Sequence, residues 1–456
     1  MALTTINPAT GETVATFDEH SVDEVERRIA ASVEAFRTWS VRPVPERAAV
    51  LSRAADLLDA ERDAFGRLMT VEMGKTFRSA RDEAAKCALG LRYYAEHAET
   101  FTAPVVIEQE GMRHGEVRFE PLGTVLAIMP WNFPFWQVIR FAAPALAAGN
   151  VGILKHASNV PQCAMALEDL FRRAGAPPGV FQVVLIGSSR VESVVTDSRV
   201  SAVTLTGSEG AGRAVAEAAG RHLKKTVLEL GGSDPFIVAP SADLDTAVET
   251  AVAARIVNNG QSCIAAKRFI VLESIADAFT ERFVKRMSSL RVGDPMLPDT
   301  DVGPLATAAI RDELDAQVEE TISRGATVLL GGSPLAGNGW FYPATVLDDI
   351  PRGAPARELE LFGPVASIFR VPSIDAAIAL ANDTVFGLGA SARTTDAVEA
   401  EHFASGLEAG SVFINGMVAS DPRFPFGGVK QSGYGRELGS WGLREFVNLK
   451  TVRRLA

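Results

Sequence analysis

The stretch Val125-Leu126-Ala127-Ile128-Met129-Pro130-Trp131-Asn132-Phe133-Pro134 joins a short apolar run to a turn bracketed by two prolines. An apolar run of five residues followed by such a turn is typical of a buried strand. Similar runs recur downstream with helical patterns between several of them: strands at 151–154, 181–186, 202–205 and 226–230, helices at 161–173 and 210–223. This alternation predicts a mostly parallel, doubly wound sheet whose ligands bind at the carboxyl ends of the strands.

The flanking sequence predicts further units on both sides of this sheet. Apolar positions at helical spacing predict helices from Val22 to about Glu99. Two short strands, Val105–Ile107 and Val117–Phe119, are expected to form a hairpin through a turn near Gly111. After Gly231-Gly232 the alternation restarts, which predicts a second α/β domain: helices at 243–257 and 275–290, strands at 268–272, 365–369 and 412–415.

Composition excludes several classes of protein. The 456 residues are 47% hydrophobic and 22% charged with a net charge of −11, which is typical of a globular protein and disfavours nucleic-acid binding. The three cysteines, Cys87, Cys163 and Cys263, are too few and too scattered for a disulfide framework. No signal pattern or apolar span is apparent, so we expect a cytoplasmic protein without a membrane segment. No metal-ligand spacing is seen.

Cys263 follows a glycine-containing turn, Asn258-Asn259-Gly260-Gln261-Ser262, and precedes an apolar run. A thiol on a turn is placed to act as a nucleophile, although a lone cysteine is more often a small buried hydrophobe. Glu229 ends the apolar run 226–230, where desolvation would raise its pKa toward that of a general base. The alternative for Glu229 is a capping or ion-paired carboxylate at a domain boundary.

Asn132 lies in the stiff Pro-Trp-Asn-Phe-Pro turn, where its amide is a candidate donor to an oxyanion or simply satisfies its own turn. Lys155 ends the strand at 151–154 and is either a cofactor ligand or a snorkelling surface lysine. Gly207-Ser208 precedes a helix, and Ser208 predicts an N-cap that could accept a pyrophosphate. This segment lacks the G-x-G-x-x-G pattern, so alone it predicts only a capped helix.

Taken together, these motifs resemble the aldehyde dehydrogenase superfamily over essentially the whole chain. The ordered matches are Pro-Trp-Asn-Phe-Pro at 130–134, Pro-Ala-Leu-Ala-Ala-Gly-Asn at 144–150, Lys155, Thr-Gly-Ser at 206–208, Leu-Glu-Leu-Gly-Gly at 228–232, Gly-Gln-Ser-Cys at 260–263, Glu-Leu-Phe-Gly-Pro at 360–364 and Pro-Phe-Gly-Gly-Val-Lys at 425–430. The resemblance implies a Rossmann-type cofactor domain (1–229), an α/β catalytic domain (230–425) and a C-terminal return segment (426–456). Residues 104–122 and the tail from Thr451 would form a small β oligomerisation arm of a homodimer or homotetramer.

The resemblance also implies a mechanism. Cys263 would attack an aldehyde to give a thiohemiacetal whose oxyanion the Asn132 amide holds; hydride transfer would leave a thioester that water activated by Glu229 hydrolyses. Dinucleotide contacts would come from Trp131, Asn132, Lys155, His156, Ala157, Ser158, Gly207, Ser208, Leu230 and Glu360, the His156 side chain being expected mainly to pack. Ser158 stands where NAD-preferring relatives often carry a glutamate, so NADP is predicted, with NAD as a weaker cofactor.

The segment 155–161 and the run 230–235 resemble bacterial succinate-semialdehyde dehydrogenases, so succinic semialdehyde is the predicted substrate. Arg140 and Ser420 match residues that bind the substrate carboxylate, while the alternative for Arg140 is a structural role. Some relatives carry a second arginine where this chain has Val257, for which Arg255 and Arg423 are candidate substitutes. Ala265 replaces the cysteine of relatives with a redox-switch disulfide. Glutarate semialdehyde, lactaldehyde and a catalytically silent binding protein are the rival functions.

Overall fold

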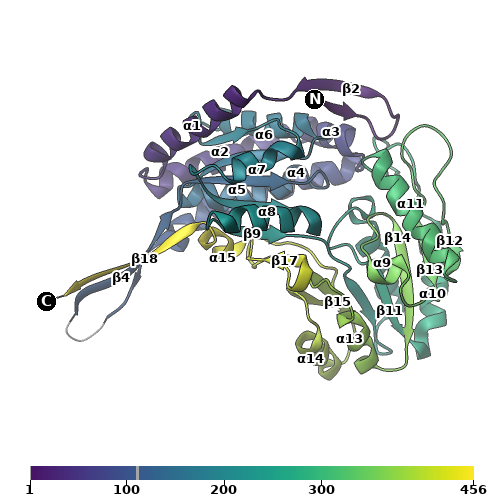
Figure 1. Ribbon diagram of the computed structural model, residues 1–456. Helices are drawn as coiled ribbons and strands as arrows, with labels where there is room; N and C mark the ends of the chain where they lie inside the picture. Colours follow the sequence, from purple (N-terminus) through teal and green to yellow (C-terminus); the bar gives the residue numbers. More distant parts are fainter. Residues whose placement is uncertain (1, 109–111, 456) are drawn as a thin grey trace.

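The computed structural model describes residues 2–108 and 112–455, and within them the chain builds two large sheets with helices and a projecting three-stranded arm (Figure 1). An N-terminal hairpin and four helices come first: β1 (Ala2–Ile6), β2 (Thr13–Asp18), α1 (Val22–Trp39), α2 (Val44–Ala60), α3 (Arg62–Met73) and α4 (Phe77–Thr102). Side chains of Ser21 and Thr76 cap α1 and α4, and Gly74 ends α3 at φ 81°. The predicted helical region is confirmed.

The first sheet has the strand order β17-β9-β8-β5-β6-β7 and is parallel except for β17. Its strands are β5 (Thr124–Met129), β6 (Val151–His156), β7 (Phe181–Val183), β8 (Val200–Thr206), β9 (Lys225–Glu229) and β17 (Gly433–Tyr434). Its helices are α5 (Trp136–Ala148), α6 (Pro161–Arg173), α7 (Val191–Val195) and α8 (Glu209–Arg221), with a 3₁₀ turn at 188–190. The strand predicted at 181–186 ends at Val183, because β6 offers ladder partners only from Gly152 to Leu154.

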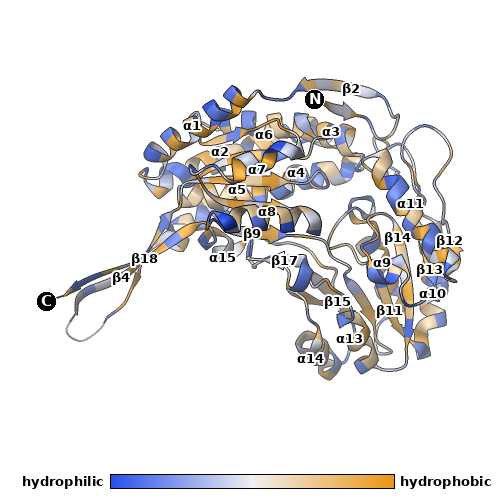
Figure 2. Ribbon diagram, viewed as in Figure 1, coloured by the Kyte–Doolittle hydropathy of each residue, from blue (hydrophilic) through white to orange (hydrophobic). Residues whose placement is uncertain are grey.

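The second sheet has the order β12-β13-β14-β11-β10-β15-β16 and is parallel except for β12. Its strands are β10 (Pro235–Val238), β11 (Arg268–Leu272), β12 (Thr327–Leu330), β13 (Thr345–Asp348), β14 (Val365–Val371), β15 (Gly389–Arg393) and β16 (Ser411–Ile414). Its helices are α9 (Leu244–Ile256), α10 (Glu273–Ser288), α11 (Ala308–Ser323), α12 (Pro355–Glu358), α13 (Ile374–Asn382) and α14 (Ala397–Gly406). Apolar residues concentrate on the strands, as a parallel sheet covered on both faces requires (Figure 2). The α/β class is confirmed.

After the second sheet the chain returns to the first. A 3₁₀ turn at 430–432 leads into β17, which pairs antiparallel with β9 so that Gly433 stands opposite Glu229; α15 (Gly439–Arg444) follows. The boundaries predicted at 229/230 and 425/426 stay a prediction, supported by this division of the strands between two sheets.

The arm differs from the predicted hairpin in its main partner. β4 (Met112–Pro121) pairs along its length with the C-terminal strand β18 (Val447–Leu455), and β3 (Val105–Val106) adds only a short edge. The predicted turn near Gly111 lies outside the described residues. Figure 1 shows the arm projecting from the body with the C-terminus at its tip. Val105, Val106, Leu449 and Leu455 on it are exposed.

Replacing Gly433 tests the return strand. Its φ is 114°, and a Cβ there would lie 2.0 Å from the carbonyl oxygen of Leu228, so Gly433→Ala must strain or break the β17–β9 pairing. We expect the free energy of unfolding in urea to fall by about 1–3 kcal/mol. In the control Gly220→Ala, where nothing lies within 4 Å of the new methyl group, stability should hold or rise by up to ~1 kcal/mol. Equal urea midpoints for Gly433→Ala and the wild type would contradict this assignment.

Candidate active site

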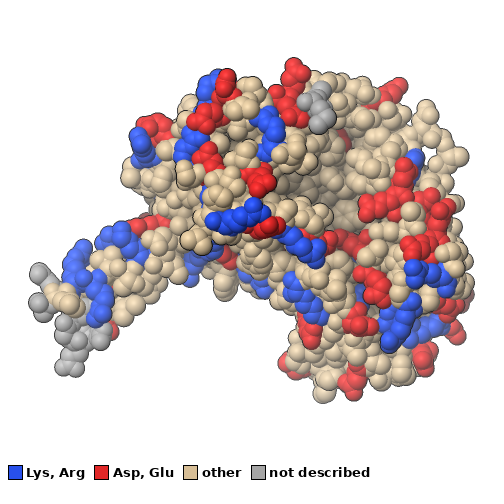
Figure 3. All heavy atoms as spheres, viewed as in Figure 1, with Lys and Arg blue, Asp and Glu red and all other residues tan. Residues whose placement is uncertain are grey.

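A cavity of about 410 Å³ lies where loops from the two sheets meet. It is lined by Pro130, Trp131, Asn132, Thr206, Gly207, Ser208, Glu209, Leu230, Gly231, Cys263, Ile310, Glu313, Leu314, Gln317, Leu359, Glu360, Phe362 and Phe386. In Figure 3 the surface is hollowed between the regions of α8 and α11, and the hollow itself shows mostly uncharged side chains. The structure thus brings together seven of the predicted site residues: Trp131, Asn132, Gly207, Ser208, Leu230, Cys263 and Glu360.

Asn132 is fixed beside the loop that carries the thiol. Its side-chain Nδ2 donates to the carbonyl oxygen of Gln261 at 3.2 Å, and its backbone carbonyl accepts from Nδ2 of Asn258 at 2.6 Å. Asn132 is buried, and an amide nitrogen carries two hydrogens. One N–H therefore remains to donate to a group bound near Cys263.

A buried ion pair that the sequence analysis missed supports this turn. Glu83 Oε1 on α4 accepts hydrogen bonds from the backbone N–H groups of Phe135 and Trp136, each at 2.9 Å. The other carboxylate oxygen pairs with Lys75, whose ammonium lies 4.3 Å from the ring centroid of Phe133. Both charged side chains are excluded from solvent. Nothing in the spacing of two charges near a helix start distinguishes this pair from a surface pair.

The loop before Cys263 has a strained backbone held by side chains. Asn258, Asn259 and Gly260 have φ values of 55°, 59° and 77°, in the left-handed region. Asn259 Nδ2 donates to the carbonyl oxygens of Gly74 and Pro304 at 2.9 and 3.1 Å. These contacts fix the turn that presents the thiol.

Lys267 and Arg255 hold the same loop by its carbonyl oxygens. Lys267 Nζ donates to Ser262 at 2.8 Å and to Cys263 at 2.6 Å, and it also pairs with Glu360 at 3.0 Å. Arg255 is fully buried and donates to Gly260 at 2.8 Å. Arg255 is therefore a structural residue, and its candidacy as a substitute substrate arginine is wrong, because its guanidinium faces backbone carbonyls.

The surroundings of Cys263 keep its thiol protonated. Burial, and next the Glu360 carboxylate, raise the pKa of Cys263 to about 12, although Lys267 and Arg140 oppose the shift. At neutral pH the thiolate fraction is then very small, and since the thiolate is the nucleophile, the thiol needs activation.

Glu229 ends β9 and is fully enclosed. Both carboxyl oxygens lack a hydrogen-bond partner within the described residues, and a Cβ on Gly427 would lie 2.7 Å from one of them. Burial, and next the Glu437 carboxylate, raise the pKa of Glu229 well above its usual range. Glu229 is not among the residues that line the 410 Å³ cavity. Its burial therefore disfavours the ionised carboxylate.

Arg140 and Ser420, the predicted carboxylate ligands, have different surroundings. Arg140 on α5 is buried, pairs with Glu437, and its guanidinium lies 4.7 Å from the ring centroid of Phe426. Its contact with a substrate carboxylate stays a prediction. Ser420 Oγ accepts hydrogen bonds from Lys86 Nζ at 2.7 Å and from Trp136 Nε1 at 3.0 Å. Arg423, the other proposed substitute, is exposed and bonded to Asp421.

The predicted cofactor residues Lys155 and His156 lie at the end of β6, which pairs in parallel with β5. Lys155 stands beside Ile128, and His156 stands beside Met129 at the end of β6. His156 Nε2 lies 2.8 Å from the Pro134 carbonyl and its Nδ1 accepts from the Ala157 N–H at 2.9 Å, so Nε2 carries the proton. Burial lowers the pKa of His156 to about 4. This neutral imidazole ties β6 to the Pro-Trp-Asn-Phe-Pro turn, as its expected packing role requires.

These groups fit a phosphorylated dinucleotide. The buried Lys155 ammonium, whose pKa is lowered by burial, gains from an anionic ligand. Ser158 is exposed on the turn after β6, and Ser208 caps α8 by accepting from the Ala211 N–H, as predicted. The N-terminus of α8 therefore lies at the carboxyl edge of the sheet, where such ligands bind.

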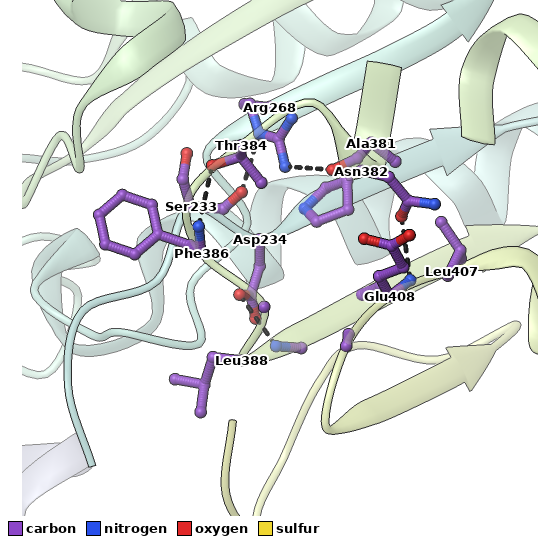
Figure 4. Close-up of a pocket in the computed structure, with 15 residues that line it drawn as sticks. Ser233, Asp234, Arg268, Ala381, Asn382, Thr384, Phe386, Leu388, Leu407 and Glu408 are labelled. Atoms are coloured by element: carbon purple, nitrogen blue, oxygen red, sulfur yellow. Dashed lines mark hydrogen bonds between the residues drawn. The ribbon is translucent and has the colours of Figure 1, made fainter. Parts of the chain in front are cut away.

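A second, very small hollow is an anchor rather than a ligand site. It is about 10 Å³, large enough for one water, and is lined by residues that begin β10 and precede β15 (Figure 4). Arg268 donates there to the carbonyl oxygens of Ser233, Leu380 and Ala381, and Asp234 accepts from the Gly389 N–H. Figure 4 shows these polar groups directed at backbone.

The profile of the aldehyde dehydrogenase family matches residues 1–452. The chain belongs to this family. A relative from Mycolicibacterium paratuberculosis named as an NADP(+) succinate-semialdehyde dehydrogenase is 57% identical over 455 residues, 99% of this chain and 96% of that protein. One of the same name from Mycobacterium tuberculosis is 56% identical over 454 residues, 99% of each chain. These matches confirm the family resemblance of the motifs.

Solved structures agree. The crystal structure of succinic semialdehyde dehydrogenase from Streptococcus pyogenes in complex with NADP+ is 37% identical, covers 100% of each chain and has a TM-score of 0.97. A succinate-semialdehyde dehydrogenase structure from Burkholderia pseudomallei is 36% identical, covers 100% of this chain and 95% of that one, and also has a TM-score of 0.97. The aldehyde dehydrogenase fold is thereby confirmed. No helix in the described part of the chain has the length and hydropathy needed to cross a membrane.

The Lys75–Glu83 pair yields a stability prediction. Lys75→Met leaves the Glu83 charge buried without its partner, so we expect the free energy of unfolding to fall by about 3–5 kcal/mol. The double variant Lys75→Met/Glu83→Gln should regain most of this loss, because an uncharged glutamine can still accept from the Phe135 and Trp136 N–H groups. Urea unfolding of the four proteins in the cycle measures the coupling. If Lys75→Met is as stable as the wild type, the ion pair contributes nothing to the free energy of unfolding.

Proposed function

We propose that the protein oxidises succinic semialdehyde to succinate with NADP+ and water, releasing NADPH and protons. The observation that carries this proposal is the 57% identity, over 99% of the chain, to an NADP(+) succinate-semialdehyde dehydrogenase. The geometry supports it, because the thiol, an amide donor and a cofactor-sized cavity occur together.

In the proposed mechanism the Cys263 sulfur forms a bond to the aldehyde carbon, and the thiol proton leaves to a base. The free N–H of Asn132 and a backbone N–H near Cys263 hold the resulting oxyanion. NADP+, when bound, supplies the hydride acceptor for this thiohemiacetal. Water then attacks the Cys263 thioester, with Glu229 taking its proton, and succinate leaves as the thiol is restored.

The raised pKa values place a condition on this mechanism. Glu229 must become ionised to act as a base, and burial beside Glu437 opposes ionisation. Rotation of the Glu229 side chain from the pocket near Gly427 toward the cavity would increase its solvation and lower its pKa. The proposed mechanism therefore requires the Glu229 carboxyl to reach the water that attacks the Cys263 thioester.

We also propose the finer properties that the sequence predicted. NADP is preferred over NAD because Ser158 places no carboxylate against a 2′-phosphate and Lys155 supplies positive charge. The arm, with exposed apolar residues on β3 and β18, joins subunits of a homodimer or homotetramer. The three free cysteines agree with a reducing cytoplasmic location. The intact Cys263, Glu229 and Asn132 favour an enzyme over a silent binding protein.

The deciding experiment measures NADPH formation by the purified protein with succinic semialdehyde, glutarate semialdehyde and lactaldehyde. We expect succinic semialdehyde to give the highest kcat/KM, Cys263→Ala to abolish turnover, and the control Cys87→Ala to remain active because Cys87 is buried in the core. Higher kcat/KM for another aldehyde would overturn the substrate assignment, and no turnover of any aldehyde would favour the silent role.

Cofactor choice has its own test in Ser158→Glu. The new carboxylate would repel the 2′-phosphate and accept hydrogen bonds from ribose hydroxyls, so the ratio of kcat/KM for NADP to that for NAD should fall at least tenfold, ~1.4 kcal/mol. The control Ser198→Glu, which makes the same change at an exposed serine just before β8, should leave the ratio near that of the wild type. A wild type that prefers NAD would contradict the proposal directly.

A further inference from the structure

Lys86 on α4 is a half-buried cation with an uncommon set of neighbours. Its Nζ donates to Ser420 Oγ at 2.7 Å and lies 4.6 Å from the ring centroid of Trp136. Within residues 2–108 and 112–455, no carboxylate lies within ion-pairing distance of it. A lysine removed from water in this way ordinarily finds a carboxylate partner.

The nearby carboxylates are occupied by other cations. Glu83 pairs with Lys75, and Asp421 pairs with Arg423. These charges therefore do little to neutralise the Lys86 ammonium, which keeps two N–H groups for another acceptor.

Ser420 is surrounded by donors as well. Its oxygen accepts from Lys86 and from the Trp136 indole, and among the described residues no acceptor is found for its own hydroxyl hydrogen. A lysine, a serine hydroxyl and an indole N–H thus converge with no anionic acceptor, which is the composition of an anion site.

The cluster is joined to the candidate active site through helix α5, because Trp136 contacts both Lys86 and Ser420. Trp136 begins α5 directly after the turn that carries Asn132, and Arg140 follows one turn later. Arg140 Nη2 donates to Thr206 Oγ1 at 3.4 Å, and Thr206 lines the 410 Å³ cavity together with Cys263. Arg140 itself is neutralised by Glu437, whereas Lys86 is not.

We propose that Lys86, together with the Ser420 hydroxyl, binds the carboxylate of the semialdehyde substrate. The inference rests on the proposed function and assigns the charge recognition to α4, which supplies the cation that the chain lacks at Val257. Arg140 adds a longer-range positive potential but has its own partner. An uncharged aldehyde of the same length gains nothing from this cluster.

The test compares succinic semialdehyde with butanal in the full-length enzyme with NADP. For Lys86→Gln, the ratio of kcat/KM for succinic semialdehyde to that for butanal should fall by about 10–100-fold, the loss of a charge-assisted hydrogen bond. Lys86→Arg should restore part of the ratio. Arg92→Gln, which removes an exposed cation from the same helix, should not change it. The inhibition constant of succinate, read without turnover of an aldehyde, should rise in parallel for Lys86→Gln.

The pH profile gives a second readout that a purely structural role would not move. Burial, and next the Arg140 charge, lower the pKa of Lys86 to about 8, while Cys87, Glu83 and Asp421 oppose the shift. Because only protonated Lys86 attracts a carboxylate, the wild-type ratio for the two aldehydes should fall as pH rises above about 8. Lys86→Gln should show a flat ratio.

The outcomes separate this inference from the proposed function. A wild type that does not prefer succinic semialdehyde over butanal would defeat the proposed function. A wild type with that preference, unchanged in Lys86→Gln at all pH values, would overturn the role of Lys86 alone. Equal loss of activity on both aldehydes, with a flat pH profile, would assign Lys86 to structure and also overturn the inference.

Discussion

The site depends on side-chain donors that hold the backbone carbonyls of the nucleophile loop. Asn132 and Asn258 both donate to Gln261, and Lys267 donates to Ser262 and Cys263. Left-handed backbone at consecutive asparagines costs about 1–3 kcal/mol per residue, so the surrounding structure must offset it. These donors come from the first sheet's turn and the start of β11, so the thiol is correctly placed only when both sheets are assembled.

Burial sets the chemistry of this assembled site. It raises the pKa of Cys263 and of Glu229, so that the ionised forms of both the nucleophile and the base are disfavoured. A neutral thiol in a partly enclosed cavity is slow to react with adventitious electrophiles and oxidants, which act on the thiolate. The same enclosure strengthens the electrostatic interactions of any charged group of the substrate or cofactor, because the local dielectric screening is weak. The reactivity of the Cys263 thiol therefore depends on whether substrate and cofactor occupy the cavity.

The sequence predicted the parts of the protein that local patterns control. Short apolar runs located β5, β6, β8 and β11, and ordered motifs located the residues that line the cavity. β15 was missed because Gly-Ala-Ser-Ala-Arg at 389–393 has no apolar periodicity, although every residue is buried. The family resemblance grouped residues 104–122 with the C-terminal tail but did not specify the β4–β18 pairing, and the Lys86–Ser420 bond, 334 residues apart in sequence, was missed. Such contacts depend on how the assembled sheets are packed, and no local pattern carries that information.

The neighbours of Arg140 give it an electrostatic role in addition to the substrate contact that its motif predicts. Its guanidinium pairs with Glu437, and its charge also bears on Glu229, Cys263 and Lys86. It favours the ionised forms of the carboxyl and the thiol, and it disfavours a second cation at Lys86. An anion bound at Lys86 would weaken that repulsion, and its own negative charge would offset part of the help that Arg140 gives to the two anions. Charge at the substrate end is thereby coupled to the ionisation of the nucleophile and base, without any movement of the backbone.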